Sequence, residues 1–235
     1  MGEAKVRLYV EQPLGQGQSV LLPQDQAHYL FGVMRLKQGD SVALFNGSDG
    51  EWRADVSEAG KRGGTLTCTT QTNPQGAAPD IWLLFAPIKK ARSDFIVEKS
   101  VELGAARICP VQTDFTNSER IRRDRLQAHA TEAAEQCGIT YVPEVADLAK
   151  LDRVLADWPA DRALIFCDES LAGDGSSFWQ KYPRERATER GAEPQKAAIL
   201  IGPEGGFSEA ERTRLQALPF TQPIPLGPRI LRADT

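Results

Sequence analysis

Two segments near the carboxyl end of the chain carry the residues whose types and spacing best suit ligand binding. Residues 198–211 read AILIGPEGGFSEAE, and residues 225–232 read PLGPRILR. In both segments an apolar run accompanies a loop of glycine and proline. A short apolar run bounded by turn residues is typical of a strand covered on both faces, so we expect a strand over Ala197–Ile201. Because glycine lacks Cβ, the backbone of such a loop can approach a ligand closely.

The spacing around the first loop narrows the chemistry that it could support. Ser208 and Glu211 have the spacing of a capping box and predict a helix that opens directly after the loop. Two such loops at the carboxyl ends of parallel strands form a crevice suited to a nucleotide-like ligand. The glycines at 202, 205 and 206 do not form a dinucleotide fingerprint, and no Gly-Lys-Ser/Thr follows. A ligand site and a plain turn both remain open from spacing alone.

The elements that would position these loops begin at Ile81. From there apolar runs that predict strands alternate with segments of helical pattern, which favours an α/β fold with a mostly parallel sheet. We expect Ile96, Val97, Ser100, Val101 and Leu103 on the buried side of the first helix, which Gly104 ends. The further strands are expected at Ile81–Ala86, Arg107–Val111, Ala163–Cys167 and Phe220–Pro225, and the helices at Ser93–Leu103 and Arg120–Cys137.

The amino-terminal part has a different pattern. Short apolar runs separated by turn residues, including Asn46-Gly47 and Asp49-Gly50, predict a small β-rich barrel with one short helix at His28–Leu36. Residues 72–79 are the expected linker. The sequence thus predicts one domain over residues 1–75 and a second over 76–235. The barrel strands are expected at Arg7–Glu11, Ser19–Leu22, Ser41–Phe45, Trp52–Ser57 and Thr65–Thr70.

Composition is compatible with two modest domains. The chain has 235 residues, is 41% hydrophobic and has no apolar run of membrane-spanning length or long secretory signal. Four cysteines, at 68, 109, 137 and 167, lack metal-ligand spacing, so we expect reduced core or near-core thiols and no metal. The net charge is −4, without the bulk basic character of many RNA-binding proteins. Basic residues are instead gathered locally, with four arginines within residues 119–125.

Several motifs together resemble one family. Ile-Gly-Pro-Glu-Gly-Gly-Phe-Ser-x-x-Glu (201–211), followed by Leu-Gly-x-Arg-Ile-Leu-Arg (226–232), resembles the RsmE family of SPOUT-class RNA methyltransferases. Residues 28–40, 89–104 and 132–136 are also similar to that family. The resemblance implies methylation of uridine N3 in bacterial small-subunit (16S) ribosomal RNA, with S-adenosylmethionine as cofactor.

The resemblance also implies features that pattern alone does not give. It implies a PUA-like RNA-binding barrel, a deep trefoil knot at the carboxyl end of the sheet, a homodimer and a cytoplasmic location. Threaded chains are nearly absent among folds, and this family would be an exception. Family members continue past the second motif with an alanine-rich helix, whereas this chain ends at Thr235. We expect a protein that truly ends there to bind cofactor poorly.

The reaction that the resemblance implies suggests roles for residues of the two loops. We expect Arg232 to stabilise negative charge as uridine N3 loses its proton, and Glu204 to act as a base or to bind the ligand. A structural ion pair for Arg232 and a turn-stabilising role for Glu204 are the alternatives. The expected cofactor contacts are Leu200, Ile201, Gly202, Glu204, Gly205, Gly206, Leu226, Gly227, Ile230 and Leu231.

Basic residues outside the loops are the candidates for RNA contact. Phosphate contacts position an RNA without reading its sequence, so a few local patches could suffice. Each of these residues could equally be a solvated surface charge. The candidates are Arg7, Arg35, Lys89, Lys90, Arg92, Arg122 and Arg123.

Two other function classes remain open at this stage. A dinucleotide-dependent oxidoreductase would need an acidic ribose-binding residue about twenty positions after the first loop, and none lies near position 222. A non-catalytic ribosome-assembly factor would use the barrel and the arginine cluster without a cofactor.

Overall fold

The computed structural model describes residue 4 and residues 6–60, 62–117, 120–172, 196–229 and 231–234. The chain divides into two compact units. The first contains residues 1–77 together with 131–142, and the second contains residues 78–130 and 143–235. A segment from the middle of the chain therefore belongs with the amino-terminal unit.

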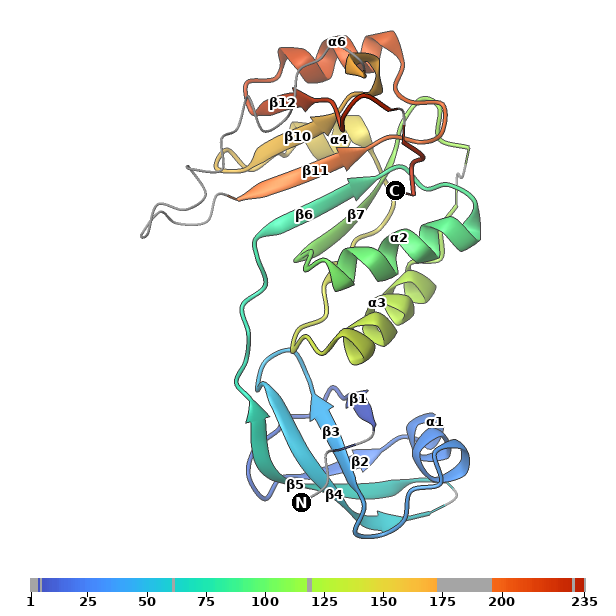
Figure 1. Ribbon diagram of the computed structural model, residues 1–235, viewed down its shortest axis with the longest axis vertical. Helices are drawn as coiled ribbons and strands as arrows, with labels where there is room; N and C mark the ends of the chain where they lie inside the picture. Colours follow the sequence, from blue (N-terminus) through green and yellow to red (C-terminus); the bar gives the residue numbers. More distant parts are fainter. Residues whose placement is uncertain are drawn as a thin grey trace. The chain divides into compact units, whose positions relative to one another are not determined.

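The first unit is built on a five-stranded sheet (Figure 1). Only its β1–β3 pair is parallel, and the other pairs are antiparallel. In β2 Val20 and Leu22 are buried while Leu21 is 67% exposed, as the two-residue period of a strand requires. The strands lie in the order β1 (Arg7–Tyr9), β3 (Ser41–Phe45), β4 (Glu51–Ala59), β5 (Gly64–Asn73) and β2 (Ser19–Leu22). These elements confirm the predicted β-rich module.

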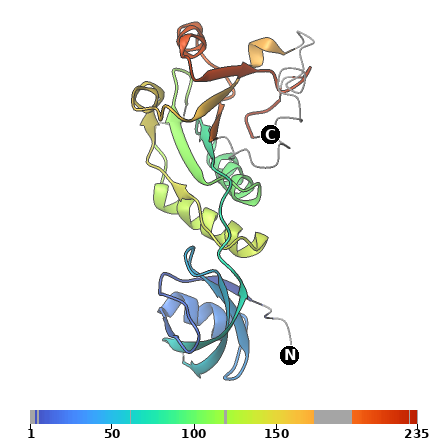
Figure 2. The same cartoon turned by 90° about the vertical axis from the view of Figure 1, so that its left-hand side faces the viewer.

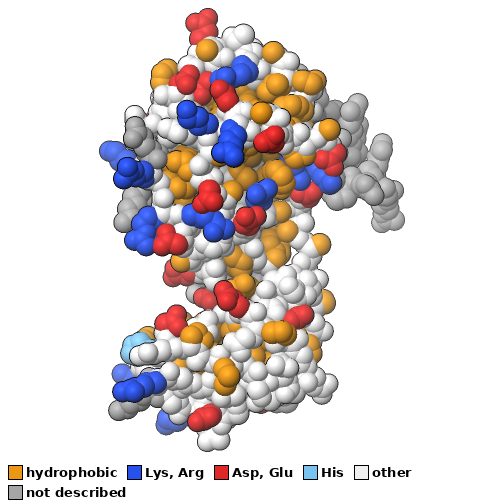
Figure 3. Space-filling view, turned by 180° about the vertical axis from the view of Figure 1, so that it is seen from behind, with side chains coloured by type: hydrophobic (Ala, Val, Ile, Leu, Met, Phe, Trp, Pro, Cys, Tyr) orange, Lys and Arg blue, Asp and Glu red, His pale blue; other side chains and the backbone are white. Residues whose placement is uncertain are grey.

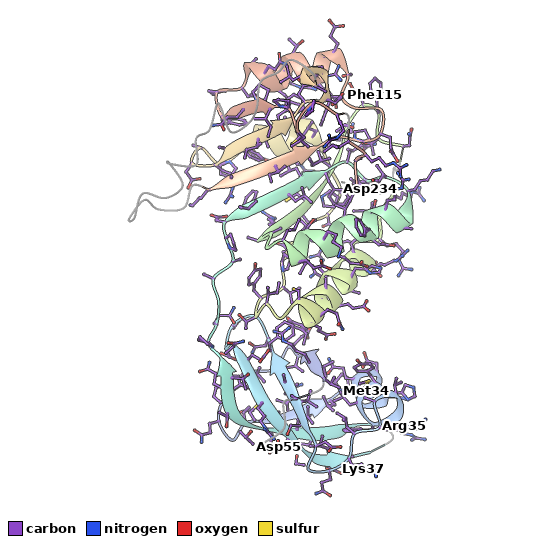
Figure 4. The ribbon with its side chains drawn as sticks, in the orientation of Figure 1. Met34, Arg35, Lys37, Asp55, Phe115 and Asp234 are labelled. Carbon is purple, nitrogen blue, oxygen red and sulfur yellow. The ribbon has the colours of Figure 1, made fainter. Side chains whose placement is uncertain are left out.

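The short helix of this unit differs from its prediction. Instead of one helix over His28–Leu36, the chain forms α1 (Gln24–Ala27) and then a π-helix, η1 (His28–Val33). Gly32 lies against the His28 imidazole, where a Cβ would come within 2.9 Å of Nδ1. The next turn places Arg35 at φ 57°, a left-handed conformation uncommon for a residue other than glycine. Figure 4 labels Arg35 beside Met34 after this helix.

The second unit contains a parallel sheet. Its strand order is β12-β10-β11-β6-β7-β8, with β9 paired to β7, and every pair is parallel. The α/β class and the mostly parallel sheet are thus confirmed. The two-residue strands β8 and β9 are too short to show a period and were not predicted. The strands are β6 (Ile81–Phe85), β7 (Arg107–Gln112), β8 (Glu144–Val145), β9 (Ala149–Lys150), β10 (Ala163–Cys167), β11 (Ala197–Ile201) and β12 (Thr221–Ile224).

Helices cover both faces of this sheet. Figure 2 shows α2 (Lys90–Glu102) and α4 (Leu151–Ala156) on opposite sides of the strands. The predicted inner face of α2 is confirmed for Ile96, Val97, Ser100 and Val101, which are buried. The prediction that Leu103 is buried is wrong, because the helix ends at Glu102 and the Leu103 side chain is 86% exposed in the following turn. The remaining helices are α3 (Arg123–Cys137), the 3-10 helix η2 (Glu169–Leu171) and α6 (Glu209–Ala217).

Strand alternation decides which side chains of β11 face the core. Ala198 and Leu200 are fully buried and pack in a cluster with Phe166 and Phe207, whose rings meet edge to face. Ile199 and Ile201 point to the other face, on the side of α2, where they line a cavity. The same cluster holds Leu84 of β6, so its neighbour Leu83 is on the cavity side.

The thiols differ in exposure. Cys68 and Cys109 are buried and Cys167 is half-buried, as expected for core or near-core residues. Cys137 is exposed, which corrects the expectation for that residue, because it occupies the last position of α3. Among the described residues no helix is long and apolar enough to cross a bilayer. The stretch over residues 168–196 is rich in Gly, Ser, Arg and Glu, and its composition predicts a helix or loop excursion. Most of it, residues 173–195, lies outside the described residues.

Candidate cofactor site

A cavity of about 710 Å³ lies on the α2 side of the parallel sheet. Its walls come from the loop after β11, the segment after β12, the residues that follow β10, and one face of α2. Because β10, β11 and β12 are parallel neighbours, their carboxyl ends meet at one edge of the sheet. The two glycine loops found in the sequence are therefore brought together by the fold.

The first loop depends on its glycines for shape. A Cβ at Gly202 would lie 2.6 Å from the Phe207 ring, so that ring can pack against the backbone only at a glycine. Gly206 is buried with φ +69°, a conformation that other residues rarely adopt. A Cβ at Gly205 would meet Cβ of Phe115 at 3.3 Å, a tighter but adjustable contact. Figure 4 labels Phe115 in the turn after β7.

A capping box fixes the start of the helix that follows, as predicted. The Ser208 hydroxyl accepts a hydrogen bond from the Glu211 backbone N–H, and the Glu211 carboxylate accepts one from the Ser208 N–H. Glu211 is 2% exposed and also accepts from the Asp114 N–H at 2.9 Å. The Ser208 hydroxyl donates to the Asp114 carboxylate at 2.5 Å. The glycine loop is thereby tied to the turn after β7.

An acidic pair at the end of β10 also lines the cavity and was missed by the sequence analysis. The Asp168 side chain is fully buried, and its Oδ1 accepts from the Ser170 N–H and hydroxyl at 3.0 and 2.7 Å. Glu169 is ion-paired with Arg212 of α6. Two acids directly after an apolar strand were the available signal, because ligands bind at the carboxyl ends of such strands.

The second loop forms another part of the wall. Gly227 has φ +101°, and Leu226 and Leu231 remain 51% and 40% exposed beside the cavity. Arg232 is also in this wall. The chain then reaches Asp234, whose carboxylate pairs with Arg92 of α2 at 3.5 Å (Figure 4).

The predicted cofactor residues divide into those that line this cavity and those that do not. The predicted contact of the Leu200 side chain with the cofactor is corrected, because strand alternation turns that side chain into the core. Gly205 and Gly227 belong to the two loops but are not in the wall, and Ile230 lies outside the described residues. Those in the wall are Ile201, Gly202, Glu204, Gly206, Leu226 and Leu231, together with Arg232, which was predicted for catalysis.

Arg7 has a structural role within the first unit. Its guanidinium pairs with Glu51 at 2.5 Å, donates to the carbonyls of Ala134 and Ile139 at 2.6 and 2.5 Å, and lies 3.8 Å from the Phe45 ring centroid. The side chain is only 14% exposed. All its capacity for phosphate contact is thus engaged, and we withdraw Arg7 as an RNA contact.

The other basic candidates are in different situations. Arg123 donates to the Val145 carbonyl at 2.7 Å and so ties α3 to β8, whereas Arg122 is 76% exposed and paired with Asp124. Arg35 and Lys89 are exposed, and Arg92 lines the cavity. The Lys90 side chain is not among those that the structure describes. On the face shown in Figure 3, Lys and Arg are interspersed with Asp and Glu.

The thiols and possible metal ligands add little to the chemistry of the site. Cys167 lines the cavity, but burial raises its pKa to about 12, so the unreactive thiol predominates at neutral pH. No group of three His, Cys, Asp or Glu side chains that could hold a metal ion occurs within the described ranges.

Comparison with known proteins identifies the family. A family model described as an RNA methyltransferase domain matches residues 76–235, more than half of the chain. The chain belongs to the RNA methyltransferase family. A second model, described as an RNA methyltransferase PUA domain, matches residues 22–67 of the first unit.

Individual RNA methyltransferases are similar along nearly the whole chain. Ribosomal RNA small subunit methyltransferase E of Synechocystis is 30% identical over 221 residues, covering 92% of this chain and 69% of the relative. The enzyme of the same name from Rickettsia conorii is 26% identical over 230 residues, with coverages of 97% and 90%. These relatives are named as enzymes, so the non-catalytic interpretation is not supported.

Solved structures of RNA methyltransferases share the fold. Ribosomal RNA small subunit methyltransferase E from Neisseria gonorrhoeae, bound to S-adenosylmethionine, has a TM-score of 0.81 at 26% identity. A putative methyltransferase from Legionella pneumophila, in complex with the same cofactor, has a TM-score of 0.82 at 28% identity. Both alignments cover 97% of this chain and 92% of the other.

Proposed function

We propose that this RNA methyltransferase transfers a methyl group from S-adenosylmethionine to N3 of a uridine in small-subunit (16S) ribosomal RNA. The observation that carries the proposal is the 710 Å³ cavity walled by both glycine loops at the carboxyl ends of parallel strands. Relatives similar over nearly the whole chain are named for the methylation of small-subunit ribosomal RNA, which supports this substrate class.

The residues of the cavity fit the cofactor. A volume near 710 Å³ is within the usual range of about 300–1,000 Å³ for small-molecule sites. Leu226, Leu231 and Ile201 offer apolar surface to an adenine, and the backbone near Gly202 and Gly206 offers close approach without Cβ atoms. We assign cofactor binding to these five residues, with main-chain contributions from Gly205 and Gly227 and a contact from Ile230.

The reaction needs a proton removed from the substrate. When bound, the cofactor supplies an electrophilic methyl group on a sulfonium, and the methyl–sulfur bond breaks as the bond to N3 forms. We assign acceptance of the N3 proton to Glu204, which is exposed in the wall. We assign to Arg232, which also lines the cavity, the stabilisation of the negative charge that a deprotonated uridine would develop. Both loops together hold the reacting groups in alignment.

The remaining parts of the proposal concern the RNA and the assembly. The first unit supplies RNA affinity through its PUA-like module, with Arg35 as the phosphate contact. In the second unit, Lys89, Lys90, Arg92 and Arg122 contribute further positive charge. We also propose a trefoil-knotted second unit, a homodimeric assembly and a cytoplasmic site of action in ribosome biogenesis.

Methyl transfer to isolated ribosomal subunits tests the function. Small and large subunits from cells deleted for this gene are incubated with the protein and cofactor carrying a labelled methyl group. The expected result is label in the small subunit only, with incorporation reduced at least tenfold in Arg232→Ala. Label in large subunits alone, or in neither, would contradict the proposal. Glu209→Gln, an exposed residue outside the cavity wall, is the matched control and should keep full activity.

A further inference from the structure

The acidic pair after β10 is the feature of the cavity that the proposed chemistry leaves unused. Both carboxylate oxygens of Asp168 already have donors within the protein: Oδ1 accepts two hydrogen bonds from Ser170, and Oδ2 accepts one from Gln216 at 3.3 Å. Glu169 is different. Its side chain is 33% exposed and in the cavity wall, and within the described part of the chain only Arg212 is recorded as its hydrogen-bond partner.

The charges of this corner do not cancel. Arg212 is shared between Glu169 and Asp168, with its Nε 3.4 Å from Asp168 Oδ1. Two carboxylates against one guanidinium leave one net negative charge at the cavity wall. Elsewhere in the wall, Arg92 is paired with Asp234, and Lys99 is paired with Glu102. The wall also holds Glu204, Arg229 and Arg232, so the excess negative charge at the end of β10 is a local feature of that corner.

The glycine loop lies directly against this charge. A Cβ on Gly206 would come within 2.0 Å of Glu169 Oε1, so the loop backbone and the carboxylate share one small volume beside the cavity. Gly206 is buried, and electrostatic interactions strengthen where water is excluded. A ligand held by this loop would thus lie close to the carboxylate of Glu169.

We infer that Glu169, held in place by Arg212, recognises a cationic group of the cofactor and so determines specificity for the charged methyl donor. This inference rests on the proposed cofactor site. S-adenosylmethionine carries a sulfonium and an ammonium, both of which a carboxylate attracts. The product S-adenosylhomocysteine keeps only the ammonium, and 5′-methylthioadenosine has neither charge. A carboxylate directed at the sulfonium would favour release of the product after transfer.

Calorimetric titration of the wild-type protein and Glu169→Gln with these three ligands tests the inference. Glutamine keeps the size of the side chain and removes its charge. The expected result is about a 10- to 100-fold loss of affinity for S-adenosylmethionine and none for 5′-methylthioadenosine, the order of size of a close interaction between a carboxylate and a cation. An equal loss for S-adenosylhomocysteine identifies the ammonium as the partner, and no loss identifies the sulfonium.

A purely structural role gives a different pattern. If Glu169 only supports the loop, Glu169→Gln should weaken all three ligands alike, and this result would overturn the inference. Glu169→Asp keeps the charge and should retain a preference for the charged ligands even if overall affinity falls. Glu209 is an exposed residue at the start of α6 and lies outside the cavity wall. Glu209→Gln should therefore leave the affinity for all three ligands unchanged.

The wild-type protein alone separates this inference from the proposed function. Binding of S-adenosylmethionine with no preference over 5′-methylthioadenosine would overturn the role of Glu169 while leaving the cofactor site in place. Absence of binding by all three ligands would overturn both. Thermal unfolding of each variant confirms that it is folded. If Glu169→Gln does not fold, the absence of a wild-type preference for the charged ligands would still overturn the inference.

Discussion

At the scale of single residues, the structure separates arginines that are buried in contacts within the protein from those that are exposed on its surface. Sequence cannot make this distinction, because a guanidinium near a helix end looks the same in a list of residues whether or not it is buried. Arg7 was an RNA candidate by sequence, yet it caps the carbonyls at the end of α3 and pairs with Glu51. Exposed Arg35 and Arg122 keep their place as candidates.

Arg7→Ala should destabilise the first unit. The substitution removes an ion pair, two short hydrogen bonds to carbonyls and the contact with Phe45. It also removes the ion-pair partner of Glu51, whose side chain is 13% exposed in the wild-type protein. The expected loss is about 2–4 kcal/mol of unfolding free energy, measured by urea denaturation. Arg122→Ala is the matched control and should change stability by less than about 0.5 kcal/mol. Equal stability of the two variants would show that the contacts of Arg7 are energetically minor.

Cysteine reactivity gives a second residue-scale prediction. Burial raises the pKa of Cys109 to about 11 and of Cys167 to about 12, and it also raises the pKa of Cys68. At pH 8, below these pKa values, the three thiols remain protonated and shielded, whereas Cys137 is exposed. Iodoacetamide should therefore alkylate Cys137 first, as read by peptide mass mapping. Labelling of Cys167 at the same rate would show that the cavity wall opens in solution.

At the scale of elements, apolar pattern predicted most strands and missed what lacks a pattern. Ser19–Leu22, Ser41–Phe45, Ala163–Cys167 and Ala197–Ile201 were predicted with the bounds observed. The π-helix was missed, because a single wider turn leaves no periodic pattern in the sequence; within it Gly32 lies against His28.

In the candidate site, too, features with a local sequence pattern were predicted and features without one were missed. Both glycine loops were predicted, since glycine and proline mark turns directly. Leu200 was wrong because a continuous apolar strand does not reveal which face points to the core and which to a cavity. Asp168 and Glu169 were missed because their partner Arg212 is more than forty residues away, a pairing that only the fold brings about.

The glycines of the first loop should differ in their tolerance of a methyl group. Gly206→Ala forces a residue with Cβ into φ +69° and against Glu169, so cofactor affinity should fall at least tenfold, measured by calorimetry. Gly205→Ala meets only Cβ of Phe115 at 3.3 Å and should lose much less. Equal losses for the two variants, with both proteins folded, would count against the loop geometry as the origin of binding.

The capping box gives a prediction about stability in the same region. Glu211→Ala removes the acceptor for two backbone N–H groups, those of Ser208 and Asp114. Because Glu211 is 2% exposed, the orphaned groups would lack ready access to water. The expected cost is about 2–3 kcal/mol in thermal or urea unfolding. A cost below about 0.5 kcal/mol would show that water replaces the lost acceptor.

At the scale of the whole molecule, the chain combines a β-rich unit matched by a PUA model with a parallel α/β unit that carries the cavity. A net charge of −4 is compatible with an RNA enzyme if its positive charge is local rather than general. Binding to ribosomal RNA should then be weakened by salt only modestly, because few phosphate contacts release few counterions. The first unit contains the match to an RNA methyltransferase PUA domain, and the second contains most of the match to an RNA methyltransferase domain.

The position of the transferred methyl group is the most direct test of the account. Small subunits from cells deleted for this gene are treated with the protein and S-adenosylmethionine, and the nucleosides of their 16S RNA are then separated and identified by mass spectrometry. The account predicts one new nucleoside, N3-methyluridine, reduced at least tenfold when Arg232→Ala replaces the wild-type protein. A methyl group on another atom or another nucleoside would contradict the proposed chemistry.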